Sequence, residues 1–357
     1  MRIAVDATGG DVGAGVIVPG AVAGARASGV ALALVGPTAV IQAELAKIDT
    51  SSLDISVVEA PDTIEMTEHP AQAVRAKPNS SIVVAIKDVK VGNSAAMVSA
   101  GHSGAVMAAA LFSLGRVKGI DRPAIASTIP TLRGQTLVLD LGAVTDPKPQ
   151  HLVQFALMAQ VYAQRILGLT NPSIGLLSNG EEPSKGNLFV QQVYPLLLGT
   201  AGINFAGNID GKDVPGGTVD IVVTDGFTGN VALKVAEGTA TLMTEMLRKE
   251  LTATLPRKLA ALFLRSGFRQ VRRRLDYSET GGAPLLGVDG TVVISHGRSN
   301  ETAILNAIKA AKRAVEVDLP GGIREAVAAT VAKTADSAPD APADVRQATE
   351  IGRGVDR

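Results

Sequence analysis

The sequence predicts an α/β protein in which a mixed, mostly parallel β-sheet lies between two layers of helices. Short apolar, β-branched runs alternate with longer segments of helical periodicity along the chain. The runs are apolar almost throughout, as in strands that helices bury on both faces. Glycines, 38 among 357 residues, cluster just after the runs, where strand-to-helix turns are expected. The chain is long enough to bury a large core.

Seven runs are predicted strands, and helices are expected between them. The runs are residues 3–6, 31–35, 55–58, 95–99, 136–140, 174–177 and 219–224. Between residues 123 and 141, two apolar runs are separated only by Arg133, Gly134 and Gln135, which predicts a turn and an antiparallel pair. Two more short strands are expected at residues 283–287 and 291–295, before a helix that begins near Asn300.

The domain prediction is one α/β unit over residues 1–332, with a basic, helical insertion at about 248–275. Residues 333–357 are rich in Ala, Asp and Pro and then end in mixed charge. Such a segment buries too little apolar area to offset the entropy lost on ordering. We therefore expect it to be a disordered tail.

Composition narrows the function classes. The 34 basic residues balance the 34 acidic ones, which argues against a whole-protein field that gathers nucleic acid, and no nucleic-acid partner is expected. The absence of Cys excludes disulfides, thiolate metal ligands and a cysteine nucleophile. The first residues lack the pattern of a signal peptide, and no run is long and apolar enough to span a bilayer. These features predict a cytoplasmic protein.

One segment departs from the neutral average. Residues 248–274 contain nine basic residues and one acidic residue, Glu250, for a net charge of +8. Two apolar stripes run through the segment, offset in angle, and Ser266 and Gly267 are the predicted bend between two amphipathic helices. The pattern indicates docking onto an anionic membrane surface or onto an acidic partner. The residues expected to make the contact are Leu255, Arg257, Lys258, Leu259, Leu262, Phe263, Phe268, Arg269 and Arg272.

Four glycine-containing turns with polar neighbours follow predicted strands, at residues 6–11, 99–104, 180–187 and 225–230. In α/β sheets ligands bind outside the carboxyl ends of the strands, where helix N-termini attract anions. Neither of two segments that resemble nucleotide-binding motifs is complete. Residues 13–18 lack the third glycine of the dinucleotide fingerprint, and residues 207–212 are one residue short for a P-loop. We expect no cofactor and no metal.

Two basic residues, His102 and Lys185, stand out in these turns. His102 lies within the second turn, where it can donate to an anion or act as a base. Lys185 is followed by Gly186 and a predicted helix start, so its ammonium and free N–H groups can converge on one oxyanion. His151, at another predicted helix start, is interpreted as structural.

Taken together, six motifs resemble one family, the bacterial phosphate acyltransferases (PlsX). They are residues 6–11, 99–105, 122–124, 180–187, 225–230 and 276–287, and the likeness runs in order from Met1 to about residue 315. The resemblance implies transfer of a fatty acyl group from acyl-acyl carrier protein to inorganic phosphate, giving acyl phosphate for phospholipid synthesis. It also implies a homodimer with a fold like phosphotransacetylase and isocitrate dehydrogenase, attached peripherally to the membrane. The downstream membrane acyltransferase is a candidate partner there.

For this chemistry the candidate residues fall into two sets. The catalytic candidates are Lys185, Asn187, Asp225 and Asn230. The substrate- and phosphate-binding candidates are Gly9, Gly10, Asp11, Ser99, Gly101, His102, Ser103, Gly104 and Gly226. We hypothesise that Lys185 binds phosphate or the developing oxyanion, and that Asn187 and Asn230 position substrate.

The sequence departs from the family pattern at two places. His102 and Ser103 replace the usual Asn-Thr pair, and Val144 replaces an Asn. Two other functions therefore stay open: a short-chain phosphotransacylase that uses acyl-coenzyme A, and a non-catalytic scaffold at the membrane. Donor preference separates the two enzymes, and the lack of any acyl phosphate product would favour the scaffold.

Overall fold

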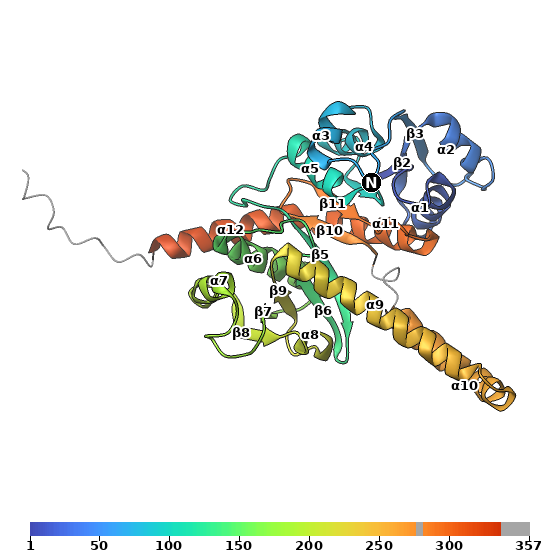
Figure 1. Ribbon diagram of the computed structural model, residues 1–357. Helices are drawn as coiled ribbons and strands as arrows, with labels where there is room; N and C mark the ends of the chain where they lie inside the picture. Colours follow the sequence, from blue (N-terminus) through green and yellow to red (C-terminus); the bar gives the residue numbers. More distant parts are fainter. Residues whose placement is uncertain (276–280, 337–357) are drawn as a thin grey trace, which may run out of the picture.

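The computed structural model describes residues 1–275 and 281–336, and its strands form one sheet (Figure 1). The strand order is β3-β2-β1-β4-β11-β10-β5-β6-β9-β7-β8. The bounds are β1 Arg2–Asp6, β2 Ala31–Gly36, β3 Ile55–Glu59, β4 Ala96–Ser99, β5 Ala124–Thr131, β6 Gly134–Leu139, β7 Ser173–Ser178, β8 Asn204–Asp210, β9 Ile221–Val223, β10 Ala283–Leu286 and β11 Thr291–Ile294.

Neighbouring strands are parallel except at three junctions in the middle of the sheet. Strands β5 and β6 form the predicted hairpin, and β10 pairs antiparallel with both β5 and β11. Parallel strands flank this centre on both sides. The prediction of a mixed, mostly parallel sheet is confirmed.

Helices fill the intervals between the strands, as expected. They are α1 Ala14–Ser28, α2 Thr38–Leu45, α3 Pro70–Ala76, α4 Ser81–Lys90, α5 Ser103–Ser113, α6 Pro149–Arg165, α7 Leu188–Leu198, α8 Asp213–Gly216, α9 Gly226–Leu251, α10 Leu255–Leu275, α11 Glu301–Glu316 and α12 Leu319–Asp336. The predicted helix near Asn300 is α11, and the Asn300 side chain caps it by accepting from the Ala303 N–H at 2.9 Å.

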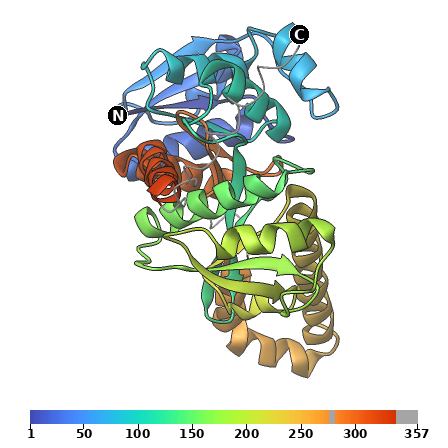
Figure 2. The ribbon, with the colours of Figure 1, turned by 90° about the vertical axis from the view of Figure 1, so that its left-hand side faces the viewer.

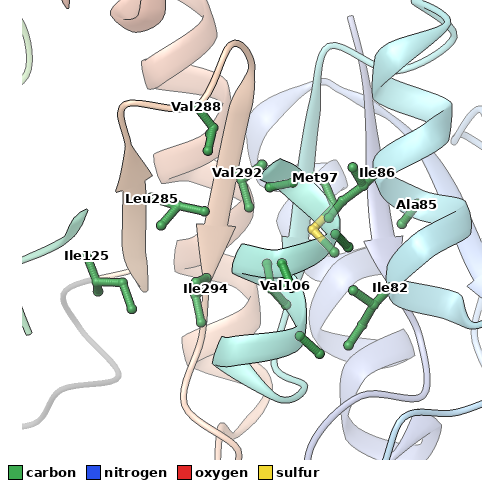
Figure 3. Close-up of a cluster of buried hydrophobic side chains, with 14 of the residues drawn as sticks. Ile82, Ala85, Ile86, Met97, Val106, Ile125, Leu285, Val288, Val292 and Ile294 are labelled. Carbon is green, nitrogen blue, oxygen red and sulfur yellow. The ribbon is translucent and has the colours of Figure 1, made fainter. Parts of the chain in front are cut away.

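Strand β4 shows why the apolar runs are nearly continuous. Met97 faces a cluster that includes Ile86 of α4 and Val106 of α5, whereas Val98 faces α1 and α11 on the other side. Both faces of the strand are thus covered by helices, which gives the three layers that the sequence predicts. Figure 3 shows the first cluster continuing to Leu285 of β10, in the antiparallel centre of the sheet.

Helices α1 and α11 pack in close contact because α1 carries glycine at the crossing. A Cβ on Gly20 would lie 2.8 Å from Glu301 O, and a Cβ on Gly24 would lie 2.9 Å from Ile308 Cβ. Small residues let the two backbones approach within a distance that a larger side chain would forbid. The close packing holds α11, and the loop that precedes it, against the first strands.

Helices α9 and α10 project from the lower part of the molecule as an arm (Figures 1 and 2). The predicted bend at Ser266 and Gly267 is wrong, because α10 runs without interruption from Leu255 to Leu275. The break falls earlier, at residues 252–254. Pro256 favours a helix start there, because the N–H that proline lacks would have no partner in the first turn of a helix. Gly267 lies inside α10, and one interior glycine weakens a helix without ending it.

Two further differences concern β8 and the C-terminal tail. Strand β8 is absent from the sequence-based prediction; it contains Asn and Gly, which have low strand propensity, and it lies at the sheet edge, paired only with β7. Helix α12 continues to Asp336, four residues into the predicted tail, whose residues 337–357 lie outside the described part of the chain. Residues 276–280 of the last family motif also lie outside it.

Candidate active site

A buried carboxylate, Asp6, joins the turns that follow β1 and β4. The Ser99 hydroxyl donates to Asp6 Oδ2 at 2.6 Å, and the Gly101 N–H donates to Ser99 Oγ at 2.9 Å. Burial raises the pKa of Asp6, and hydrogen bonds from Ser99 and the Thr8 backbone oppose that shift. Ser99, a phosphate-binding candidate, therefore gives its hydroxyl hydrogen to Asp6 and helps to fix the two turns.

The turn after β1 also contacts the loop after β11. The Asp11 N–H donates to Gly297 O at 2.8 Å. A Cβ on Gly9 or Gly10 would come within 2.7 Å of the backbone of the turn after β4, and Gly10 has a φ of +80°, so both positions require glycine. The turns after β1, β4 and β11 thus form one backbone-linked group at the carboxyl ends of adjacent strands.

His102 begins helix α5. Its Nδ1 accepts from the Gly104 N–H at 3.2 Å, so the imidazole acts as the N-cap, and Ser103 is the first helical residue. A side-chain acceptor at an N-cap satisfies an N–H group that the helix leaves unpaired. An Asn side chain offers the same kind of acceptor, and the imidazole can therefore replace it in this structural role.

The loop that contains Val144 is held by a second buried carboxylate, Asp140. This side chain accepts from the backbone N–H groups of Ile125, Gly142, Ala143 and Val144, at 2.6–3.2 Å. Burial raises the pKa of Asp140, and these four donors oppose the shift. Val144, which replaces the Asn of the family pattern, therefore holds the loop through its backbone N–H, and this contact does not depend on its side chain.

The start of α9 packs on this loop. Gly226 N–H donates to Val144 O at 2.9 Å, and Asn230 Nδ2 donates to Leu141 O at 3.2 Å. Asp225 caps the helix by accepting from the Thr228 N–H at 2.8 Å. The Asp225 side chain therefore caps α9, and the Asn230 side chain and the Gly226 N–H tie α9 to the loop.

Lys185 lies in the turn before α7, and its side chain is exposed. Gly186 N–H donates to Asn179 Oδ1 at 2.8 Å, and Asn187 Oδ1 accepts from the Val190 N–H at 2.9 Å as the cap of α7. The helix thus begins at Leu188, two residues later than the sequence indicates. Lys185 lies two residues before Asn187, and its aliphatic chain passes beside Gly180, where a Cβ would lie 2.9 Å from Lys185 Cγ.

A cavity of about 320 Å³ brings two catalytic candidates, Asn187 and Asp225, to one place. It is lined by Leu152, Leu176, Leu177, Ser178, Asn179, Gly186, Asn187, Phe189, Val190, Thr224, Asp225 and Thr228. Lys185 and Asn230 are not among the lining residues. The phosphate-binding candidates of the first turns, by contrast, gather around Asp6, so the candidates form two groups on the two halves of the sheet.

Sequence reasoning missed two residues that link these halves, Lys234 of α9 and His296 after β11. Lys234 Nζ lies 3.3 Å from His296 Nε2, and it also pairs with Glu237 at 2.9 Å. The available signal was the turn after the strand at residues 291–294, which resembles the other glycine turns in position and in its polar residues.

The arm carries the exposed apolar side chains that the sequence assigns to docking. Leu255, Leu259, Leu262, Phe263 and Phe268 are all exposed, from 38% at Phe268 to 86% at Phe263. None of the described helices is both long enough and apolar enough to cross a membrane.

Basic side chains accompany this apolar surface. Lys258 and Arg269 are exposed, and Arg257 pairs with Glu250 at 2.8 Å. The side chain of Arg272 lies outside the described part of the structure.

A larger cavity of about 1210 Å³ lies between the β5–β6 hairpin and helices α6 and α11, with Met243 and Val271 of the arm in its lining. It contains none of the candidate residues.

Acidic and imidazole side chains are the groups that could hold a metal ion in this chain, which has no Cys. Within residues 1–275 and 281–336, no group of three or more His, Asp or Glu side chains is placed to hold a metal ion. Asp11, Lys234, Glu237 and Arg298 all act electrostatically on His296, and they carry both signs of charge.

Comparison with known proteins gives matches over most of the chain. Residues 1–321 match the family described as fatty acid synthesis protein. A protein of Desulfitobacterium hafniense (strain Y51) named phosphate acyltransferase is 50% identical over 317 residues, which cover 88% of this chain and 94% of that protein. Another phosphate acyltransferase, of Elusimicrobium minutum (strain Pei191), is 47% identical and covers 92% and 96%.

Solved structures share the fold at low sequence identity. A phosphotransacetylase from Streptococcus pyogenes superposes with a TM-score of 0.60 at 18% identity, over 88% of this chain and 94% of that one. The EutD phosphotransacetylase from Staphylococcus aureus gives a TM-score of 0.56 at 17% identity, with the same coverage. The expected likeness to the phosphotransacetylase fold is confirmed.

Proposed function

Since this chain belongs to the fatty acid synthesis protein family of phosphate acyltransferases and is an acyltransferase, we propose that it transfers a fatty acyl group from acyl-acyl carrier protein to inorganic phosphate. The product is acyl phosphate, which supplies phosphatidic acid synthesis. The observation that carries the proposal is the identity of about half of all residues with phosphate acyltransferases over nearly the whole chain.

The proposed reaction needs no covalent intermediate on the enzyme. A phosphate oxygen attacks the thioester carbonyl carbon, and the carbonyl oxygen becomes an oxyanion. The carbonyl then re-forms, the C–S bond breaks, and the carrier leaves as a thiolate that takes up the proton lost by the phosphate. Phosphate is the nucleophile, which agrees with a chain that has no Cys. The protein must supply an anion site, donors for the oxyanion and orientation of both substrates.

Lys185 is the proposed donor to phosphate or to the oxyanion. Lys185 is exposed and lies two residues before Asn187, the cap of α7, so an incoming anion can reach its side chain. Asn187 uses Oδ1 to cap the helix, which leaves its amide NH₂ to donate to substrate in the cavity it shares with Asp225. Asp225 caps α9, whose first turn lines this cavity, and Asn230 ties α9 to the loop at Leu141.

We assign the α9–α10 arm to peripheral contact with the membrane or with the carrier protein. Its segment at residues 248–274 has a net charge of +8, and its apolar side chains are exposed beside the basic ones. A basic amphipathic helix binds anionic lipid by burying apolar area and pairing charge, and it can pair with an acidic protein in the same way.

A homodimer is part of the proposal. Along α9 the large apolar side chains of Val235, Leu242, Met243, Met246 and Leu247 are 50–61% exposed. Exposed apolar stripes of this kind mark interaction surfaces. A second copy that contributes the same helix would cover them, and the mass measured by light scattering after size-exclusion chromatography tests this.

One assay tests the proposed function against its alternatives. The protein is incubated with phosphate and either long-chain acyl-acyl carrier protein or acyl-coenzyme A, and acyl phosphate is trapped with hydroxylamine as the hydroxamate. We expect product with the carrier-protein donor. Product only from short-chain acyl-coenzyme A would favour a short-chain phosphotransacylase, and no product from any donor would favour a scaffold.

A further inference from the structure

The cavity that Asn187 and Asp225 share lies at the starts of helices α7 and α9. These helices follow β7 and β9, which pair in parallel, with Leu176 opposite Val223. The carboxyl ends of the two strands therefore lie side by side at this edge of the sheet. The volume of about 320 Å³ is at the lower end of the range for small-molecule sites, roughly 300–1,000 Å³. The cavity can thus hold a small molecule or one arm of a larger one.

The cap of each helix uses one of its polar atoms within the protein and keeps a second one for a ligand. Asn187 Oδ1 accepts from the Val190 N–H at 2.9 Å, and Asp225 Oδ1 accepts from the Thr228 N–H at 2.8 Å. Within residues 1–275 and 281–336, the Asn187 NH₂ and Asp225 Oδ2 form no hydrogen bond. The two caps thus offer one donor and one acceptor at the same cavity.

The charge of the lining argues against phosphate as the occupant. Of the described residues that line the cavity, only Asp225 is charged, and its carboxylate repels an anion. The two caps also place oxygen atoms on N–H groups at helix starts, which would otherwise attract an anion. The cavity is therefore suited to a neutral ligand.

The remaining lining is largely apolar, with hydroxyl groups among the apolar side chains. Leu177, Phe189 and Val190 supply apolar surface, and Thr224 and Thr228 supply hydroxyls. A neutral chain of methylene and amide groups matches such a lining. The carbonyl of its amide accepts from the NH₂ of the α7 cap, and the amide N–H donates to the free oxygen of the α9 cap.

We propose that this cavity binds the pantetheine part of the acyl donor, and that Asn187 and Asp225 hold one of its amide groups. Pantetheine is a neutral chain that carries amide and hydroxyl groups and ends in the thiol, and acyl carrier protein and coenzyme A share it. The assignment rests on the proposed function, because it places the thioester donor. Asn187 and Asp225 are then positioning residues, and phosphate binds outside this cavity.

Two substitutions change the atom offered to the ligand and keep the helix caps. Asp225→Asn retains an oxygen for the Thr228 N–H but replaces the free acceptor with NH₂, and Asn187→Asp retains an oxygen for the Val190 N–H but loses the donor. We expect each to raise the KM for the acyl donor about 10-fold, as for a lost charge-assisted hydrogen bond. The kcat should stay the same, because the amide is remote from the reacting carbonyl.

Asn300→Asp is the matched control, since Asn300 caps α11 in the same way, accepting from the Ala303 N–H at 2.9 Å, and is not in the lining. It should leave the KM for the acyl donor unchanged. An unchanged KM for the donor in both cavity variants would overturn the proposal. A change only in the KM for phosphate would also overturn it, and so would a fall in kcat alone, which would assign the two residues to the reacting atoms.

Acyl-acyl carrier protein and acyl-coenzyme A are assayed separately in these variants. The donor whose KM rises is the source of the arm, and a rise with both assigns the cavity to their shared pantetheine.

Binding of free pantetheine, without phosphate or carrier protein, separates this site from the proposed function. Saturation-transfer NMR detects the bound molecule, and we expect transfer with the wild type and Asn300→Asp and about 10-fold weaker binding in Asp225→Asn and Asn187→Asp. This result would support the site even if the protein makes no acyl phosphate. No transfer with the wild type would overturn the site even if the acyltransferase activity is found.

Discussion

The turns around Asp6 and the α9–α10 arm show opposite ways of using polar and apolar residues. In the turns, Asp6 and Ser99 are fully buried and hydrogen-bonded to each other, and the backbones of three loops are in contact. On the arm, Phe263 is 86% exposed and Leu255 is 72% exposed. Polar groups are inside the protein at one place, and large apolar groups are outside it at the other.

This difference matches two different functions, binding of a small ligand and contact with a large partner. A site that orients a small anion requires fixed donors, and buried hydrogen bonds such as that between Ser99 and Asp6 supply the rigidity. A surface that meets a membrane or a second protein keeps its apolar side chains available for that partner. Changes in the two regions should therefore affect different measurements.

The largest expected effect is on the rate of acyl phosphate formation. Lys185→Ala should lower kcat/KM for acyl phosphate formation on the order of 100-fold, because a charged donor to the oxyanion or to phosphate is lost. The side chain is exposed, so the free energy of unfolding should stay the same. Initial rates by the hydroxamate assay and urea unfolding measure the two quantities.

Lys309→Ala serves as the control for loss of one exposed lysine. Vesicle binding by Lys185→Ala should equal that of the wild type, since Lys185 lies outside the arm. Turnover of Lys185→Ala at the wild-type rate would contradict the role that we propose for this lysine.

The next largest effect is on the binding of the α9–α10 arm to vesicles. Phe263→Ser should weaken binding to phosphatidylglycerol vesicles about 10-fold, because a phenyl ring that inserts into lipid contributes on the order of 1.4 kcal/mol or more. Flotation or sedimentation of the protein with vesicles measures this. The free energy of unfolding should not change, since the ring is 86% exposed.

Leu259→Ser and Phe268→Ser extend this test along the arm, and Leu132→Ser, at an exposed site outside the arm, is the control. Undiminished flotation in all three arm variants would refute the membrane contact. A higher KM for acyl-acyl carrier protein in the same variants would assign the arm to the carrier protein instead.

A smaller effect concerns pH and the buried carboxylate. Burial raises the pKa of Asp6 above its ordinary value of 3.8, so the protonated form is favoured in the folded protein. Its contribution to stability is full below pH 3.8 and is lost as the pH rises through the folded pKa. The stability difference between wild type and Asp6→Asn should therefore shift against the wild type from pH 4 toward pH 7.

Urea unfolding at several pH values measures this difference. Asp54→Asn, at an exposed aspartate that pairs with Arg2, is the control for loss of a carboxylate. A difference between wild type and Asp6→Asn that grows in favour of the wild type with rising pH would show that the hydrogen bonds from Ser99 and Thr8 outweigh burial.

Much of the fold was predictable because its strands are buried on both faces. The apolar runs gave the positions of most strands, and the short turn at Arg133, Gly134 and Gln135 identified the antiparallel hairpin. Strand β8 was not predictable from propensity, since its Gly207 and Asn208 disfavour strands and only pairing with β7 holds it. Long-range pairing of this kind leaves no local signal.

The sequence was enough to predict which turns form the candidate site, but not which contacts their side chains make. Glycine turns after strands pointed to the residues around Asp6, but the sequence did not show that Ser99 and His102 form hydrogen bonds within the protein. Nor did it bring Lys234 to His296, which are 62 residues apart. Such a contact depends on the direction in which α9 leaves the sheet, and tertiary packing sets that direction.

The smallest predicted effect tests the helix that replaced the expected bend. Gly267 lies inside α10 with no atom within 4 Å of the position that a Cβ would take, so Gly267→Ala adds no clash. The substitution should stabilise the helix by roughly 0.5–1 kcal/mol, because alanine loses less backbone entropy there. Amide hydrogen exchange along α10 should slow by about 2- to 5-fold, with vesicle binding unchanged. If the docked arm instead bends at Gly267, the same substitution would weaken vesicle binding while still slowing exchange in solution.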